Sequence, residues 1–473
     1  MMSQTAQPER ETARQMPPSL AKVIAVVMLG ALMMQLDMTM TNIATKTLLV
    51  DFGSTLTTIQ WVGTGYLLAM ATTIPLAGWA MERYGARAVW LGCIGVFLAG
   101  SVLCGAAWSA TSLIGFRVLQ GFGAGTVLPV GQAVLAQAAG PRRLGRVMAA
   151  LGIPAMLGPV LGPVLGGVLV DQLSWRWIFY VNVPVCLGTL ILSWRAMPAR
   201  VAGAGARLDL LGLLLLSPGC AAVVFGLAET SRYQSMTDAH VLVPLIIGVG
   251  LLAGFAVRAL RSAAIPLIDL RLFRDRGFGS ASATMFVSGF VLFGAMSILP
   301  LFYQLARGDS AQHAGLLLMP MGVGMGLALV LGGRLANRVA PRTMALAGLA
   351  CTVAGTLVYT QLHLDTSNWL LGAAQVVSGA GIGATLVPIM SAAMAGLAPA
   401  AIPRASTGIR IMQQLGGSFG SAVILIVVQH QFAAHAATAA GLTAAFAATY
   451  WWVLAFAGVL LIPTLFLPGR PIR

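Results

Sequence analysis

Apolar residues form long runs along this chain, and short polar segments separate them. A helix that crosses a lipid bilayer needs about 20 consecutive, mostly apolar residues. The runs that reach this length lie at residues 22–46, 58–80, 88–108, 111–138, 144–170, 177–195, 208–229, 241–260, 279–305, 313–336, 343–362, 369–397, 405–429 and 443–467. The pattern predicts an all-α integral membrane protein with 14 transmembrane helices.

Composition agrees with lipid rather than water as the solvent. Hydrophobic residues make up 58% of the chain and charged residues only 9%. A soluble protein of 473 residues needs far more charge to cover its surface. The net charge of +15 could indicate nucleic acid, but the basic residues are scattered between apolar runs and form no patch interleaved with aromatic residues. We therefore expect membrane lipids, and no nucleic acid, as partners.

The basic residues also predict the orientation. With an even number of spans both termini lie on one side, and a cytoplasmic N-terminus assigns 23 Lys and Arg to the inside. Only four fall outside: Lys46, Arg176, Arg232 and Arg307. Cytoplasmic loops of membrane proteins carry this excess. We expect both termini in the cytoplasm, residues 1–20 as a cytoplasmic tail without a removable signal peptide, and a multi-pass protein of the cell inner (plasma) membrane.

Short motifs recur at a nearly constant offset. Gly158-xxx-Gly162 returns as Gly416-xxx-Gly420, displaced by 258 residues. Two further motifs recur, Gly121-Phe-Gly123-Ala-Gly125 as Gly379-Ala-Gly381-Ile-Gly383, and Gly78-xxx-Glu82-Arg83 as Gly333-xxx-Asn337-Arg338. Four matches in order, counting Arg146 with Arg404, make coincidence a poor explanation. The repeat predicts two six-helix halves, 21–195 and 279–467, with an inserted two-helix linker at 208–260.

Asp37 is the one acidic residue expected deep inside a span. An ionisable group there costs at least ~2.5 kcal/mol, so it is a candidate functional residue. The alternative is an aspartate hydrogen-bonded to nearby Thr or Asn for packing alone. At 1.5 Å per residue it lies roughly 22 Å from Lys22 and 14 Å from Lys46, somewhat outward of the membrane centre.

Arg117 is the corresponding deep base, about 9 Å inward from the expected helix end near Thr111. Both charges then occupy the outer half of the bilayer, and a pair, direct or through Gln120 and water, would relieve both burials. Burial and a neighbouring guanidinium act in opposite directions on the proton affinity of a carboxyl group. Movement of Arg117 relative to Asp37 would therefore change proton binding, which proton coupling requires.

A stripe of small residues follows in the fifth expected span. Gly158, Gly162 and Gly166 recur every four residues, and such glycines let helix backbones approach closely. Pro163 removes a backbone hydrogen bond and bends the helix. Ordinary tight packing is the alternative explanation for any single motif of this kind. The five histidines map to outer ends or loops without metal-ligand spacing, so we expect no metal site.

Together these motifs resemble the fourteen-helix drug:proton antiporters of the major facilitator superfamily, over nearly the whole chain. Parallel six-helix halves around a central cavity describe that arrangement. The matching segments are Gly158-xxx-Gly162-Pro163-xx-Gly166-Gly167 (the antiporter motif), Gly78-Trp-Ala-Met-Glu82-Arg83-Tyr-Gly85-Ala-Arg87 (the loop motif), Arg117-Val-Leu-Gln120-Gly121-Phe-Gly123 (the fourth-helix motif), Leu36-Asp37-Met-Thr39-Met-Thr-Asn42, and Trp175-Arg176-Trp177-Ile-Phe179-Tyr-Val-Asn182-Val-Pro184.

The resemblance implies roles for these residues. Asp37 would take part in coupling, and Arg117 would tune it. Gly78, Glu82, Arg83, Gly85 and Arg87 would latch the cytoplasmic side, and the bend from Gly158 to Gly167 would set antiport geometry. The sequence departs from the family in two respects: Glu82 stands where Asp is usual, and the neutral Gln413 and Gln414 stand where some relatives carry further intramembrane acids.

The expected function is proton-coupled export of lipophilic, neutral or monocationic small molecules by alternating access, that is, multidrug efflux. Asp37 would release its proton inward and compete with the substrate. We expect no cofactor besides the proton gradient, and a functional monomer. Export of a specific lipid, siderophore or metabolite is the alternative, and neither an enzyme nor a channel is favoured. Candidate cavity residues, chosen as aromatic, Met or amide side chains, are Trp61, Tyr66, Gln120, Met156, Phe290, Met412, Gln413 and Gln414.

Overall fold

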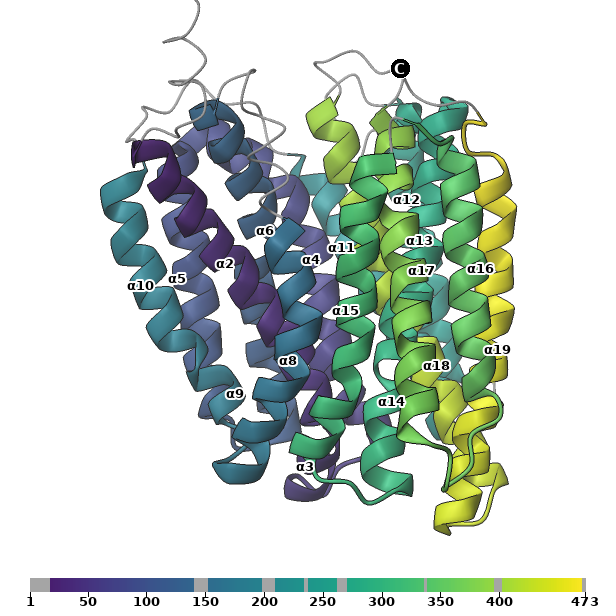
Figure 1. The fold of residues 1–473 in the computed structure, drawn as a ribbon. Helices are drawn as coiled ribbons and strands as arrows, with labels where there is room; N and C mark the ends of the chain where they lie inside the picture. Colours follow the sequence, from purple (N-terminus) through teal and green to yellow (C-terminus); the bar gives the residue numbers. More distant parts are fainter. Residues whose placement is uncertain are drawn as a thin grey trace, which may run out of the picture.

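The computed structural model describes residues 18–139, 152–197, 209–233, 237–261, 270–335, 338–394 and 402–469. Within these ranges the chain is helical, without strands. Long helices stand side by side in one bundle (Figure 1). Most carry no continuous polar face, because lipid and protein interior are both apolar surroundings.

The first part of the chain forms one group of helices, which we call the N-terminal half. Its elements are α2 (Pro18–Ile43), α3 (Thr45–Asp51), α4 (Leu56–Tyr84), α5 (Ala86–Gly105), α6 (Ala110–Ala139), α8 (Gly152–Gln172), α9 (Trp177–Tyr180) and α10 (Asn182–Ala196). The expected span at 177–195 is divided between α9 and α10, with Val181 between them. The first part of the expected span at 144–170 lies outside the described residues.

Two linker helices and the C-terminal half follow. Their elements are α11 (Leu210–Tyr233), α12 (Ala239–Arg261), η1 (Leu270–Arg274), α13 (Arg276–Met296), α14 (Ile298–Leu301), η2 (Phe302–Ala306), α15 (Ala311–Leu335), α16 (Pro341–Tyr359), α17 (Asn368–Met394), α18 (Ile402–Ala434) and α19 (Ala439–Leu465). Asp209 caps α11 by accepting the Gly212 N–H at 2.9 Å and pairs with Arg258 of α12 at 2.8 Å. The linker helices pack against each other as a pair, and α11 of this pair contacts α4 and α18.

Twelve helices of the described chain are long and apolar enough to cross a membrane. The two other expected spans, at 58–80 and 144–170, are helical as α4 and α8. They lie outside that set of twelve, so the number fourteen stays a prediction. The α2 helix begins and α19 ends at the same end of the bundle, the upper end in Figure 1.

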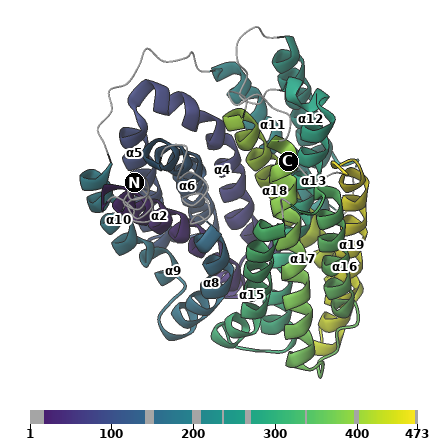
Figure 2. The same cartoon turned by 45° about the horizontal axis from the view of Figure 1, so that its top comes forward.

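The two halves meet along α4 with α18 and α8 with α15 (Figures 1 and 2). Near the lower end, hydrogen bonds join them. Lys46 Nζ donates to the Gln304 carbonyl at 2.7 Å, and Asp171 accepts the backbone N–H groups of Ala311 and Gln312 at 3.1 and 2.6 Å. The described hydrogen bonds between the halves lie near the lower end, and farther up α4 and α18 the halves are in apolar contact, for example between Ile74 and the cluster that contains Ile411.

The glycines of the repeat make equivalent contacts in both halves. A Cβ atom at Gly121 would meet Tyr66 of α4, and one at Gly379 would meet Met321 of α15. Likewise Gly125 lies against Met70 and Gly383 against Met325. Glycine at these positions lets the helix backbones touch. The internal repeat predicted from short motifs is therefore a repeat of structure.

Candidate functional site

Asp37 of α2 and Arg117 of α6 form a direct ion pair inside the N-terminal half. The Oδ2 and Nη1 atoms are 2.6 Å apart, and both side chains are at most 1% exposed. The sequence left open a direct or a water-mediated pair, and the structure shows the direct one. Two charges removed from water stay charged only when they are paired and hydrogen-bonded.

Amide and hydroxyl groups complete this ion pair. Gln120 and Asn182 each donate to Asp37 Oδ1, at 3.0 and 2.9 Å, and both amides also donate to Ser101 Oγ at 3.0 Å. Gln120 Oε1 accepts from Arg117 Nη1 at 2.7 Å. We call these five residues the ionic network. It joins α2, α5, α6 and α10.

The guanidinium group of Arg117 also has two contacts on α4. Its Nε donates to the Val62 carbonyl of α4 at 3.2 Å, and the group lies 4.0 Å above the centre of the Tyr66 ring. An arginine above an aromatic face gains more when both are shielded from water. Tyr66, expected to line the cavity, therefore packs on the ionic network instead, and Gln120 is a member of it.

The glycines of the antiporter motif face two different helices. Gly158, Gly162 and Gly166 lie against Gln35, Thr39 and Met40 of α2, whereas Gly167 lies against Ala311 and Gln312 at the start of α15. Thr39 Oγ1 donates to the Gly158 carbonyl at 3.2 Å. Any side chain larger than hydrogen would push these helices apart. The α8 helix thus connects the helix that carries Asp37 with the opposite half.

The loop motif lies at the upper end, between α4 and α5. Gly85 has φ +82°, a conformation that favours glycine. Arg87 Nη2 donates to the Trp194 carbonyl of α10 at 2.6 Å, and its guanidinium lies 4.8 Å from the centre of the Trp194 ring. Arg83 is exposed. The Glu82 side chain and the surroundings of Gly78 lie outside the described parts, so the latch stays a prediction.

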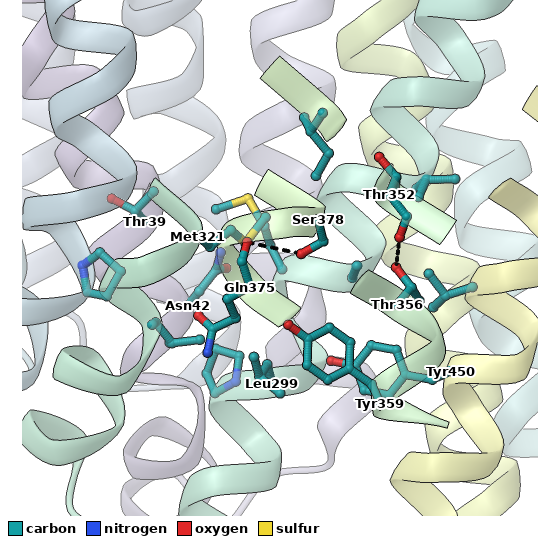
Figure 3. Close-up of a pocket in the computed structure, with 18 of the residues that line it drawn as sticks. Thr39, Asn42, Leu299, Met321, Thr352, Thr356, Tyr359, Gln375, Ser378 and Tyr450 are labelled. Atoms are coloured by element: carbon teal, nitrogen blue, oxygen red, sulfur yellow. Dashed lines mark hydrogen bonds between the residues drawn. The ribbon is translucent and has the colours of Figure 1, made fainter. Parts of the chain in front are cut away.

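A pocket opens between the C-terminal half and α2 (Figure 3). From the N-terminal half, Thr39, Asn42 and Ile43 of α2 and Pro163 of α8 line it. The other lining residues belong to the C-terminal half, and those that the argument uses are Met321, Thr356, Tyr359, Gln375, Ser378 and Tyr450. Asp37 does not line this pocket.

The other cavity candidates lie elsewhere. Trp61 packs against Phe225 of α11, with ring centres 6.1 Å apart, and Phe290 packs against Phe456 at 4.6 Å. Met412 belongs to the apolar cluster between α4, α11 and α18. Seven of the eight candidates do not line the pocket: Trp61, Tyr66, Gln120, Phe290, Met412, Gln413 and Gln414. The Met156 side chain lies outside the described parts. Residue type alone selected them, and aromatic and Met side chains fill ordinary helix contacts equally well.

Sequence reasoning missed several residues of both sites. Asn182 stood in a quoted motif without a role, and Ser101 was not considered. Their signal was a lone polar residue at a buried helix position, which needs a hydrogen-bond partner. The described residues contain no cluster of three or more His, Cys, Asp or Glu that could hold a metal ion.

A bundle of membrane-length helices, built from two repeated halves with a buried ion pair inside one of them, is typical of a membrane transporter of the two-half type. Residues 27–421 match the Major Facilitator Superfamily, and the chain belongs to this family of transporters. A multidrug resistance protein B homolog from Mycobacterium tuberculosis is 40% identical over 87% of this chain and 77% of its own length.

Two other proteins are also similar. Multidrug resistance protein 3 of Bacillus subtilis is 28% identical over 87% of this chain and 80% of its own length. A bacterial homolog of the human lysosomal transporter Spinster, in an inward-facing and unoccupied conformation, has a TM-score of 0.66 at 16% identity, covering 96% of this chain and 98% of that one. The structural likeness concerns the fold alone.

Proposed function

We propose that this chain is a proton-coupled antiporter that exports lipophilic, neutral or monocationic small molecules by alternating access, as a monomer in the cell inner membrane. The observation that carries the proposal is the ion pair of Asp37 and Arg117, sealed inside one half at 2.6 Å. Protons and the exported molecule would be its partners, with no further cofactor. The multidrug resistance relatives support export of varied substrates.

The ionic network gives this proposal a mechanism. Asp37 is paired with Arg117 and accepts hydrogen bonds from the amides of Gln120 and Asn182, and these partners come from two other helices, α6 and α10. When the halves rock, displacement of α2 relative to α6 would lengthen the ion pair, and a buried carboxylate without its cation takes up a proton. Proton uptake and release at Asp37 would thus follow the conformation of the protein.

A single buried acid also limits the charge of the cargo. With one proton entering per exported molecule, a monocation is exchanged without net charge. A neutral molecule moves one charge inward and gains ~2.3 kcal/mol per 100 mV, whereas a dication is opposed by the same amount. We therefore expect neutral and monovalent substrates to be preferred. Transport in proteoliposomes under an imposed voltage, without a pH gradient, measures this preference.

We further propose that α4 and α8 span the membrane with the other twelve helices, in the order 6 + 2 + 6, and that the upper end faces the cytoplasm. Arg83 and Arg87 lie at the upper end, whereas Lys46, Arg176 and Arg307 lie among contacts at the lower end. Cytoplasmic loops carry the excess of basic residues. Labelling of single cysteines from either side of intact cells tests this orientation.

The test of coupling is Asp37→Asn. Arg117 keeps three other partners, Gln120, Val62 and the Tyr66 ring, so we expect the variant to fold. It should lose export driven by a pH gradient. The matched control is Asp51→Asn, which neutralises an acid outside the ionic network, bonded to Trp175 Nε1 at 2.7 Å. Uphill export by Asp37→Asn under a pH gradient would refute the proposal.

A further inference from the structure

The pocket lies at the position in the C-terminal half that corresponds, through the internal repeat, to the position of the ionic network in the N-terminal half. Between α6 and α17 the repeat offset is 258, so Arg117 corresponds to Gln375 and Gln120 to Ser378. The contacts agree, because a Cβ atom at Gly100 would meet Gln120, and one at Gly355 would meet Ser378. The glycines on α5 and α16 thus face corresponding residues.

The remaining helices continue the correspondence. The offset from α4 and α5 to α15 and α16 is 255, as between Gly100 and Gly355. Tyr66, Ser101 and Cys104, which lie in or around the ionic network, therefore correspond to the pocket residues Met321, Thr356 and Tyr359 respectively.

The two places differ in charge. Among the described residues that line the pocket, none is Asp, Glu, Lys, Arg or His. Gln35 and Thr39 of α2 contact Gly158 and Gly162, as Phe286 and Phe290 of α13 contact Gly416 and Gly420, an offset of 251. Asp37 therefore corresponds to the uncharged Ser288. The C-terminal half therefore carries hydroxyl and amide side chains at the positions where the N-terminal half carries the charged side chains of Asp37 and Arg117.

Two of these polar groups lack partners. Tyr359 is 5% exposed and Gln375 is fully buried, yet Gln375 Oε1 makes no hydrogen bond, and the Tyr359 hydroxyl makes none of normal geometry, although the Ser378 side chain lies beside it. Gln375 Nε2 donates to the Leu317 carbonyl at 2.8 Å. A carbonyl can only accept, so this contact fixes the amide orientation and leaves Oε1 as a free acceptor. Unpaired buried polar atoms are costly, which points to a partner that arrives from outside.

The pocket also has an aromatic wall and a wall that can move. The rings of Tyr359 and Tyr450 are 4.9 Å apart, and Thr39, Asn42 and Pro163 close the opposite side from the other half. In this conformation the volume is ≈ 60 Å³, enough for a few water molecules. Because one wall belongs to each half, rocking of the halves changes the width of the pocket.

We propose that this pocket binds an uncharged, planar part of the exported molecule, which accepts a hydrogen bond from the Tyr359 hydroxyl and donates one to Gln375 Oε1. The identity of the ligand as an exported molecule rests on the proposed function, but its binding requires no proton gradient. Asp37 and Thr39 lie two residues apart on α2, about 200° around the helix. The proton and the substrate would thus occupy opposite faces of α2 and would not compete for one site, in contrast to the competition expected from the sequence.

The test is equilibrium binding to the purified full chain in detergent. The probes are two uncharged fluorescent molecules, 7-hydroxycoumarin, which has a donor and a carbonyl acceptor, and 7-methoxycoumarin, which lacks the donor. At mildly acidic pH, Gln375→Leu should weaken binding of the hydroxy compound about five- to tenfold and leave the methoxy compound unchanged. Tyr359→Phe should weaken both by a similar factor.

Controls separate this proposal from proton coupling. Tyr233→Phe removes a tyrosine hydroxyl on α11, away from the pocket, and should bind both compounds like the natural chain. Asp37→Asn should also bind them normally, because Asp37 does not line the pocket. Three outcomes would overturn the proposal. They are loss of binding in Asp37→Asn, an equal loss of binding of both compounds in Gln375→Leu, and failure of the natural chain to bind either compound. Uphill export by Asp37→Asn would refute the coupling proposal alone.

Discussion

Between α2, α5 and α6 the N-terminal half holds an ion pair, whereas between α13, α16 and α17 the C-terminal half holds a pocket. The helix contacts around the two places match, because the glycines of the repeat face equivalent neighbours. What differs is the small set of side chains that fills the interior. A repeated scaffold can therefore carry two different kinds of chemistry once its packing positions are kept.

The difference also has an energetic side. Both carboxylate oxygens of Asp37 accept hydrogen bonds, and the ion pair with Arg117 is buried away from solvent. In the other half, Tyr359 and Gln375 keep unpaired polar atoms. A satisfied polar network is rigid and specific, while an unsatisfied one is suited to a ligand that completes it. The N-terminal half would hold a proton-binding group in place, and the C-terminal half would accept cargo.

The largest expected effect comes from replacing Arg117 with glutamine, the residue found at the corresponding position 375 of the C-terminal half. Arg117→Gln leaves Asp37 buried without its cation, which typically costs 3–5 kcal/mol of unfolding free energy. The double variant Asp37→Ser, Arg117→Gln removes both charges and should recover most of this loss. Thermal unfolding in detergent measures both variants. Equal destabilisation by the single and the double variant would show that the charges are not coupled.

The next effect tests whether the packing of the two halves is the same. A Cβ atom at Gly125 would meet the Met70 carbonyl, and one at Gly383 would lie 2.5 Å from the Met325 carbonyl. Gly→Ala at either position should cost about 1–3 kcal/mol through displaced helices. Gly115→Ala on α6, with no atom within 4 Å of its Cβ position, is the control and should be neutral or stabilising. A cost in one half only would contradict equivalent packing.

A smaller effect concerns the junction of the halves at the lower end. Asp171 accepts two N–H groups at the start of α15, where the helix dipole favours a negative charge. Asp171→Asn should lose about 0.5–1 kcal/mol of this attraction and raise the population with separated lower ends about two- to fivefold. Distances between spin labels on α8 and α15, measured by electron paramagnetic resonance, report this population. Asp51→Asn, whose partner Trp175 lies in the same half, should leave the distances unchanged.

The fold and the ion pair were accessible from the sequence, for a physical reason. Lipid demands long apolar runs, and an acid such as Asp37 inside one of them must find a base, for which Arg117 was the sole candidate recognised. The four-residue spacing of Gly158, Gly162 and Gly166 likewise specified a close helix contact, although which helix it would meet was not specified. The structure identifies α2.

The pocket, by contrast, could not be predicted from the sequence in the same way. Its residues, such as Thr356 and Tyr359, are common residue types in apolar helices, and their meaning depends on which neighbours leave them unpaired. Trp61 and Phe290 do not line this pocket, and their choice as cavity residues stays a prediction, because residue type does not tell which way a helix face points. The repeat could have helped, since aligning Gln375 with Arg117 marks the position from the sequence alone.

The smallest effect compares the two copies of the loop motif at the upper end. Arg87 binds the Trp194 carbonyl and ring, so it ties α5 to α10, whereas its counterpart Arg342, 255 residues on, is exposed and its side chain has no described hydrogen bond. Arg87→Ala should cost about 0.5–1 kcal/mol of stability, because the contact is open to solvent, and Arg342→Ala should stay within about 0.5 kcal/mol of the natural chain. Thermal unfolding of the two variants in parallel measures the difference. Equal cost at both positions would mean that the Trp194 contact contributes nothing to holding α10, and that the loop motif acts through Glu82 or Arg83 instead.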